Sequence, residues 1–190
     1  MKKYLIVLSL LISILAISQT SNNLELDEAE YAALKEKSLR KVNDLSRYIN
    51  VFTDKTISSS NRENAVDGAV KLFNSEENLV QVSSANNSSE IKKYKVRKYF
   101  NKIRILNYSK IDISWYDIQY VSNLKQGPDG KYYGVVTIFQ KFKGYDGEGN
   151  LIYSDVTQKN IEIIIDVKEN ARGEKYSKVY LGDISVVETK

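Results

Sequence analysis

The second half of the sequence constrains the fold most, because strand-like segments follow one another there with short turns between them. From Lys110 onward apolar and polar residues largely alternate, as in β-strands with one buried face. Turn-forming residues interrupt the alternation at 127–130, 146–150 and 170–174. Strands joined by such short turns pair antiparallel. The sequence therefore predicts four long strands in one antiparallel sheet.

The first of these strands changes phase part of the way along. Its apolar positions shift by one residue, from Ile111, Ile113 and Trp115 to Tyr116, Ile118 and Tyr120. A shift of one residue indicates a β-bulge, which increases the curvature of a strand. We therefore expect a curled sheet.

The first half of the sequence has a helical pattern. Apolar residues at three- and four-residue spacing predict a long amphipathic helix over about 26–51. Ser60 and Glu63 have the spacing of a capping box at the start of a second helix, and a short strand follows at 79–82. Residues 91–104 predict a third, strongly basic helix, although part of this segment also fits a strand.

Helices followed by strands predict an α+β fold, in which two to three N-terminal helices pack in a curved, mostly antiparallel sheet. In element order over 26–188 the chain resembles the nuclear transport factor 2-like superfamily, the cone-shaped roll that includes ketosteroid isomerase and SnoaL-type cyclases. The most specific local match is a helix, polar turn and short strand in register: Ala69-Val70-Lys71-Leu72-Phe73-Asn74-Ser75-Glu76-Glu77-Asn78-Leu79-Val80-Gln81-Val82. The resemblance implies one domain over 26–190. Members are enzymes, binding proteins or assembly domains, so it implies no single function.

Residues 1–18 have the features of a secretory signal peptide. Lys2 and Lys3 precede an apolar run over 4–17, and the segment ends in small residues at Ala16 and Ser18. The run is short for a membrane span. We expect cleavage after Ser18 and an exported protein, periplasmic or extracellular, with no transmembrane segment in the mature chain.

The mature chain would begin with a flexible polar segment at 19–25, ahead of the domain at 26–190. An Ala-x-Ser signal end followed by Gln19 also resembles exported proteins of Bacteroidota.

The chain has no His and no Cys. This excludes a Ser-His-Asp triad, a Cys-His pair, disulfides and the usual zinc sites, and we expect no metal and no cofactor. The 28 Lys and Arg against 24 Asp and Glu give +4; loss of two lysines with the signal leaves 26 against 24, or +2. This surplus is too small for us to expect a nucleic-acid partner.

Asp183 is the catalytic candidate, because it shares parity with apolar residues of the last strand. A carboxylate among apolar neighbours has a raised pKa suited to acid–base chemistry. The alternative is a structural carboxylate near a strand end. Trp115, Tyr116 and Tyr133 join Asp183 as candidate ligand-binding residues, since strand aromatics line pockets as well as cores.

Two surfaces are candidates for contact with partners. The segment 92–104 holds seven cations and could bind an envelope polyanion, although a solvated helix face is the simpler explanation. Two of the predicted strands are apolar on both faces. We expect their outer faces to be covered by a second copy, most simply in a homodimer, or by an envelope protein. The expected outer residues are Tyr132, Val136, Ile138, Tyr180, Ile184 and Val186.

These observations favour an exported, non-catalytic binding or assembly module that acts through its sheet face and the mouth of the cone. The alternative is a small enzyme of the same fold, with isomerase- or dehydratase-type acid–base chemistry by Asp183 and a Tyr on an apolar ligand. A third hypothesis is polyanion binding by residues 92–104.

Overall fold

The computed structural model describes residues 26–120 and 122–190. The expected signal peptide and the segment 19–25 therefore lie outside the described residues. The elements are, in order, α1 Glu28–Thr53, α2 Ser59–Val70, β1 Leu79–Ser84, β2 Asn87–Lys95, α3 Val96–Arg104, β3 Lys110–Tyr120, β4 Lys125–Gln126, β5 Tyr132–Tyr145, β6 Leu151–Glu169 and β7 Lys175–Thr189.

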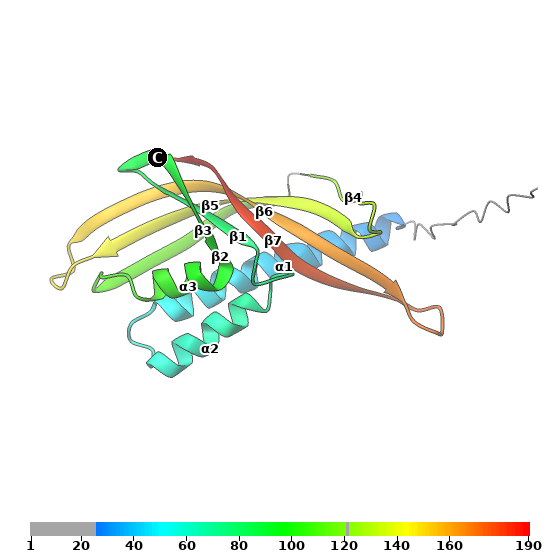
Figure 1. Cartoon of the computed structure of the whole chain (residues 1–190), viewed down its shortest axis with the longest axis horizontal. Coiled ribbons are helices and arrows are strands. Elements are labelled where there is room, and N and C mark those ends of the chain that lie inside the picture. Colours follow the sequence, from blue (N-terminus) through cyan, green and yellow to red (C-terminus); the bar gives the residue numbers. More distant parts are fainter. Residues whose placement is uncertain (1–25, 121) are drawn as a thin grey trace, which may run out of the picture.

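The strands form one seven-stranded sheet in the order β2-β1-β7-β6-β5-β3, with the short β4 paired to β5. All pairs are antiparallel except β1 and β7, which are parallel and meet at Val80 and Ile184. The long strands arch over the helices, which lie against one face of the sheet (Figure 1). The α+β prediction, with helices first and a curved sheet after them, is confirmed.

Helix α1 begins at the capping box that its sequence encodes. The Glu30 amide donates to Asp27 Oδ1 (2.7 Å), and the Asp27 amide donates to Glu30 Oε2 (3.0 Å). The apolar stripe then faces the sheet, with Val42, Leu45 and Phe52 fully buried. Helix α1 thus packs its apolar face against the sheet.

Helix α2 begins two residues before the capping box that the sequence predicted at Ser60. Its N-cap is Ser58, whose hydroxyl accepts a hydrogen bond from the Asn61 amide (3.3 Å). Gly68, in the same helix, faces α1: a Cβ there would lie 2.5 Å from the ring of Tyr48. The glycine therefore allows the two helices to approach closely.

The predicted bulge in the first long strand is confirmed. The register between β3 and β5 shifts between Tyr116 and Gln119, where Asp117 has a φ of +47°. The predicted hairpin turn also forms: the Gly127 amide donates to the Lys131 carbonyl (2.8 Å), and Gly130 takes a φ of +77°.

The single basic helix predicted over 91–104 is wrong in its first half. Residues up to Lys95 form β2, and only Val96–Arg104 is helical. The reason is pairing: β1 aligns Leu79 with Lys95 and Val82 with Lys92. The apolar residues with helical spacing all lie in α3, whereas the residues before them pair with β1.

The outer face predicted for the sheet is largely wrong. Tyr132, Val136, Ile138 and Ile184 are buried and belong to the core beneath the sheet. They share a face with the helices because Gly134, Val136 and Ile138 alternate inward along β5. The opposite face carries other aromatics, among them Tyr116, stacked on Phe139 at 5.6 Å.

Candidate ligand-binding pocket

A cavity of about 390 Å³ opens between the β1–β2 hairpin, α3 and the inner faces of β5 and β6. Its position corresponds to the mouth of the cone that the resemblance implied. It is lined by Val82, Ser83, Ser84, Asn86, Asn87, Glu90, Lys92, Tyr94, Tyr99, Lys102, Ile103, Leu106, Tyr108, Gln140, Phe142, Tyr153, Asp155, Thr157 and Lys159.

Lys159 is the most unusual residue of this pocket. It lies on β6 between Ile138 of β5 and Val186 of β7, and only 2% of it is exposed. Burial lowers the pKa of its ammonium to about 8, against the opposing effect of the Asp155 charge. Within the described residues Nζ has no ion pair, and it lies 5.5 Å from the ring centre of Tyr99.

Asp155 lies four residues before Lys159 on the same face of β6 and is also buried. Burial raises the pKa of its carboxyl, while the Tyr153 hydroxyl, which donates to Oδ2, and the Lys159 charge act in the opposite direction. Burial and then the bond to Asp155 raise the pKa of Tyr153 to about 12. Tyr153 is therefore a neutral donor at ordinary pH.

Aromatic rings form one wall of the pocket. Tyr108 and Tyr153 both pack edge-on against Phe142, with ring centres 5.8 and 5.7 Å apart. Gly144 makes this possible, because a Cβ at that position would lie 2.5 Å from the Tyr108 ring. The absence of a side chain at Gly144 thus allows the Tyr108 ring to pack against β5.

Further polar groups complete the inner face. Gln140 is buried, and its Oε1 accepts a hydrogen bond from Trp115 Nε1 (3.3 Å). Thr157, also buried, has its hydroxyl 3.1 Å from that of Thr189. The lining therefore combines an aromatic body with a cation, a carboxylate and neutral hydrogen-bonding groups.

This combination has two chemical uses. An apolar cavity with a few convergent polar groups is the usual form of a small-molecule site. With a pKa near 8, about one Lys159 amine in ten is neutral at pH 7, and a neutral amine is a base and a nucleophile. No group of three or more metal-ligating side chains occurs in the described part of the chain.

The four residues predicted as a site do not line this pocket, and the structure does not bring them together there. Trp115 supports Gln140 from β3, as described above, and Tyr116 lies on the other face of the sheet. The Tyr133 hydroxyl donates to Asp129 at the 127–130 turn (2.9 Å). Asp183 is exposed.

Asp183 holds two segments of backbone together. Its Oδ1 accepts hydrogen bonds from Asn78 Nδ2 and from the Leu79 amide, both at 2.9 Å. It thereby fastens the start of β1 to β7, which is the structural role considered as the alternative from the sequence.

The sequence contained a signal for Asp155 and Lys159 that parity alone could have found. Thr157, Ile161 and Ile163 have the same parity in the sequence as Asp155 and Lys159. Residues of one parity lie on one face of a regular strand. The pattern therefore places Asp155 and Lys159 on the inner, apolar face of β6.

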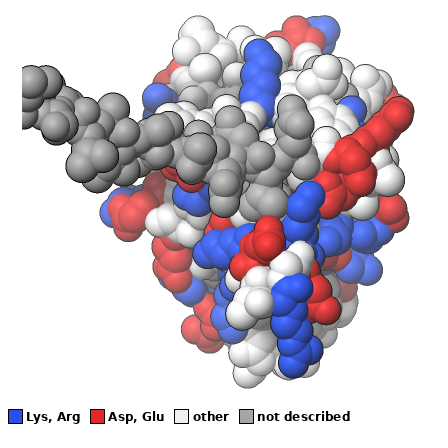
Figure 2. All heavy atoms as spheres, turned by 90° about the vertical axis from the view of Figure 1, so that its right-hand side faces the viewer, with Lys and Arg blue, Asp and Glu red and all other residues white. Residues whose placement is uncertain are grey.

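The basic segment 92–104 is divided between two elements and is partly neutralised. Arg97 bonds Glu76 through Nε (2.8 Å) and Asp67 through Nη1 (2.5 Å), and Lys95 pairs with Glu77 (2.6 Å). Elsewhere, on the face that Figure 2 shows, basic and acidic side chains lie side by side. No helix of the described residues is long and apolar enough to cross a membrane.

No protein-family model matches the sequence, and no curated protein matches it. Among solved structures, the chain aligns with SalBIII, an epoxide hydrolase/cyclase-like enzyme in pyran ring formation in the polyether salinomycin. The two are 17% identical, the alignment covers 78% of this chain and 96% of SalBIII, and the TM-score is 0.29. An alignment with so low a TM-score carries no weight for function.

Proposed function

We propose that this protein binds a small organic ligand at the mouth of the cone, with an aromatic or apolar body and a carboxylate head that pairs with Lys159. The observation that carries the proposal is the buried Lys159 ammonium, which lines an open cavity without an ion pair in the described residues. Tyr108, Phe142 and Tyr153 would contact the body of the ligand.

The energetics favour a charged head group. A pKa lowered from 10.5 to about 8 means that the buried ammonium costs about 3 kcal/mol relative to water. An anion seated beside Nζ recovers part of this cost, because ion pairs and charge-assisted hydrogen bonds are strong where water is excluded. A neutral apolar ligand would not offset the desolvation of the Lys159 ammonium, and it would also displace water that could solvate this group.

The test is a fluorescence titration with 1-anilinonaphthalene-8-sulfonate, an aromatic anion of suitable chemistry. We expect Lys159→Met, which keeps most of the length of the side chain and removes its charge, to weaken binding at least tenfold. Lys71→Met removes an exposed charge at the end of α2, away from both cavities, and should leave this binding unchanged. Equal binding by Lys159→Met and the native protein would refute the proposal.

A second candidate function, acid–base catalysis, has support from the same pocket. Asp155 has a raised pKa and lies near a base of depressed pKa, Lys159, a pattern that marks catalytic groups. In this form of the enzyme hypothesis Asp155, rather than Asp183, is the acid–base group. NMR would follow exchange of the α-protons of simple apolar ketones in D₂O. Exchange that Asp155→Asn abolishes would support catalysis, and no exchange by the native protein would count against it.

We also propose, from the sequence, that the protein is exported and that it forms a homodimer. After cleavage at Ser18, the N-terminal sequence of the mature protein should begin at Gln19. Sedimentation velocity at tens of micromolar should give a dimer; a monomer would remove the dimer proposal.

A further inference from the structure

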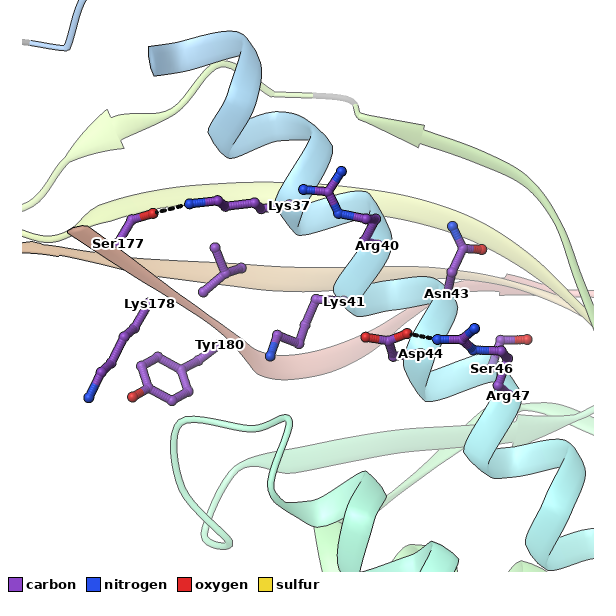
Figure 3. Close-up of a pocket in the computed structure, with 11 residues that line it drawn as sticks. Lys37, Arg40, Lys41, Asn43, Asp44, Ser46, Arg47, Ser177, Lys178 and Tyr180 are labelled. Atoms are coloured by element: carbon purple, nitrogen blue, oxygen red, sulfur yellow. Dashed lines mark hydrogen bonds and ion pairs between the residues drawn. The ribbon is translucent and has the colours of Figure 1, made fainter. Parts of the chain in front are cut away.

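A second cavity, of about 820 Å³, lies between α1 and β7, away from the cone mouth. Its residues come from one face of the helix and from the first half of the strand (Figure 3). The lining residues are Lys37, Arg40, Lys41, Asn43, Asp44, Ser46, Arg47, Ser177, Lys178, Val179 and Tyr180. We call it the basic groove.

The groove carries a strong excess of positive charge. Five of its lining residues are cations, and Asp44 is the one carboxylate among them. That carboxylate is paired with Arg47, as Figure 3 shows. Arg40 is paired with Glu36 outside the groove, and Lys37 Nζ donates to Ser177 Oγ (2.9 Å). The side chains of Lys41 and Lys178 have no ion pair or hydrogen bond within the described residues. The groove thus has free cations to offer to an acidic partner.

The other wall of the groove is an open sheet edge. Strand β1 pairs with β7 at Ile184, and Leu181 bonds backbone on that same side: its amide donates to Leu72 O and its carbonyl accepts from Asn74 N, both at 2.9 Å. Toward the start of β7 this pairing ends. From Tyr176 to Tyr180 the strand pairs only with β6 in the described part of the chain.

The backbone groups that remain unpaired lie on the free edge of β7, a strand whose residues 177–180 line the groove. Successive residues of a strand direct their amide and carbonyl groups to opposite edges. The register with β6 is unbroken between Leu181 and Lys175. Val179 and Ser177 therefore direct their groups to the same side as Leu181, away from β6. An unpaired edge of this kind accepts an added strand.

We propose that the basic groove binds an extended acidic peptide segment of a partner protein, which adds as a short strand to β7 beside α1. Open backbone favours a peptide over other anions, and charge selects an acidic one. The cations of α1 run from Lys37 to Arg47, a rise of about 15 Å. That length matches four to five extended residues at about 3.3 Å each.

The test uses a fluorescein-labelled hexapeptide of alternating Glu and Val, blocked at both ends, with fluorescence anisotropy at low ionic strength. We expect the native protein to bind it, and the same peptide with Lys for Glu to bind at least tenfold more weakly. A Glu-Val peptide with N-methylated backbone keeps its charge but loses amide donors, and it should also bind at least tenfold more weakly. Equal binding of the N-methylated peptide would overturn strand addition.

Two variants locate the site on the protein. Lys41→Glu with Lys178→Glu should weaken binding at least tenfold, whereas Lys93→Glu with Lys98→Glu makes the same change of net charge elsewhere and should have no effect. If the two pairs weaken binding equally, long-range charge explains it and the proposal fails. Binding of polyphosphate as tight as that of the peptide would likewise refute peptide recognition.

Ser177→Pro tests the edge directly. Proline is tolerated on edge strands but removes the amide and blocks an incoming strand. We expect at least a tenfold loss of peptide binding, with the cone-mouth titration unchanged as evidence of an intact fold. Unchanged peptide binding by this variant would refute the proposed edge.

Discussion

Replacement of Lys159 by methionine should remove a pH dependence that the native protein owes to one buried amine. The pKa of Lys159 is about 8 in the folded protein and 10.5 as the reference value for the unfolded chain. Between these values the unfolded chain binds more protons, so the stability of the native protein rises with pH. Below pH 8 both states are protonated, and the folded protein carries the full cost of the buried charge.

The size of the effect follows from the two pKa values. Between pH 7.5 and 9.5 the free energy of unfolding of the native protein should increase by about 2 kcal/mol through this group alone. Urea unfolding at the two pH values measures the increase. Above pH 10 the raised pKa of Tyr153 begins to act in the opposite direction, so the comparison stays below it.

Lys159→Met should show little change of unfolding free energy over the same interval. Lys178→Met, which removes an exposed amine, should keep the native increase and serves as the control. The readout is the slope with pH, because the variant also leaves Asp155 buried without its nearby cation, which alters the absolute stability. The reasoning would be refuted by equal slopes in the native protein and in Lys159→Met.

Substitutions at three other positions have defined outcomes. Gly144→Ala should lower the free energy of unfolding by about 1–3 kcal/mol, because the new methyl meets the Tyr108 ring; thermal unfolding measures it, and an unchanged melting temperature would show that Tyr108 moves freely. Asp183→Ala should cost about 1–2 kcal/mol by leaving the Leu79 amide without its acceptor, while Asp183→Asn should cost less and neither should change ligand binding at the cone mouth. The raised pKa of Asp155 means that its folded form favours the proton, so the native protein loses stability from this group as pH rises above the unfolded value of 3.8. In urea unfolding, the free energies of unfolding of Asp155→Asn and the native protein should therefore differ least at pH 3, and the variant should become more stable relative to the native protein toward pH 7. The opposite trend would contradict burial as the cause of the raised pKa.

Much of the architecture was predictable from local pattern. The capped helix at Glu28–Thr53, the bulge near Asp117 and the turn at Gly130 each depend on a few neighbouring residues. The error over 91–104 has a different origin, because the segment up to Lys95 pairs with β1. Part of the segment fits a strand as well as a helix, and the choice between them depends on a partner strand elsewhere in the sequence.

The site residues also differ in how far local pattern predicts their placement. Asp155 and Lys159 were predictable as inward-facing from the parity of Thr157 and Ile161, because the pairing of β5 with β6 is in register there. Asp183 shares parity with Leu181, but the register between β6 and β7 shifts beside it, so that Leu181 and Ile184 are both buried and Asp183 is exposed. Parity gives the face of a residue only where the strand has no bulge.

The position of β7 has a consequence for how the chain folds. The last strand lies between β1 and β6, and it joins the N-terminal helices and first hairpin to the rest of the sheet. The sheet cannot close until the fifteen residues of β7, Lys175–Thr189, insert between these two strands. The pairing of β1 with β7 joins Val80 to Ile184, and loop closure over so long a separation makes this step slow. We therefore expect insertion of β7 to be the slow step of folding.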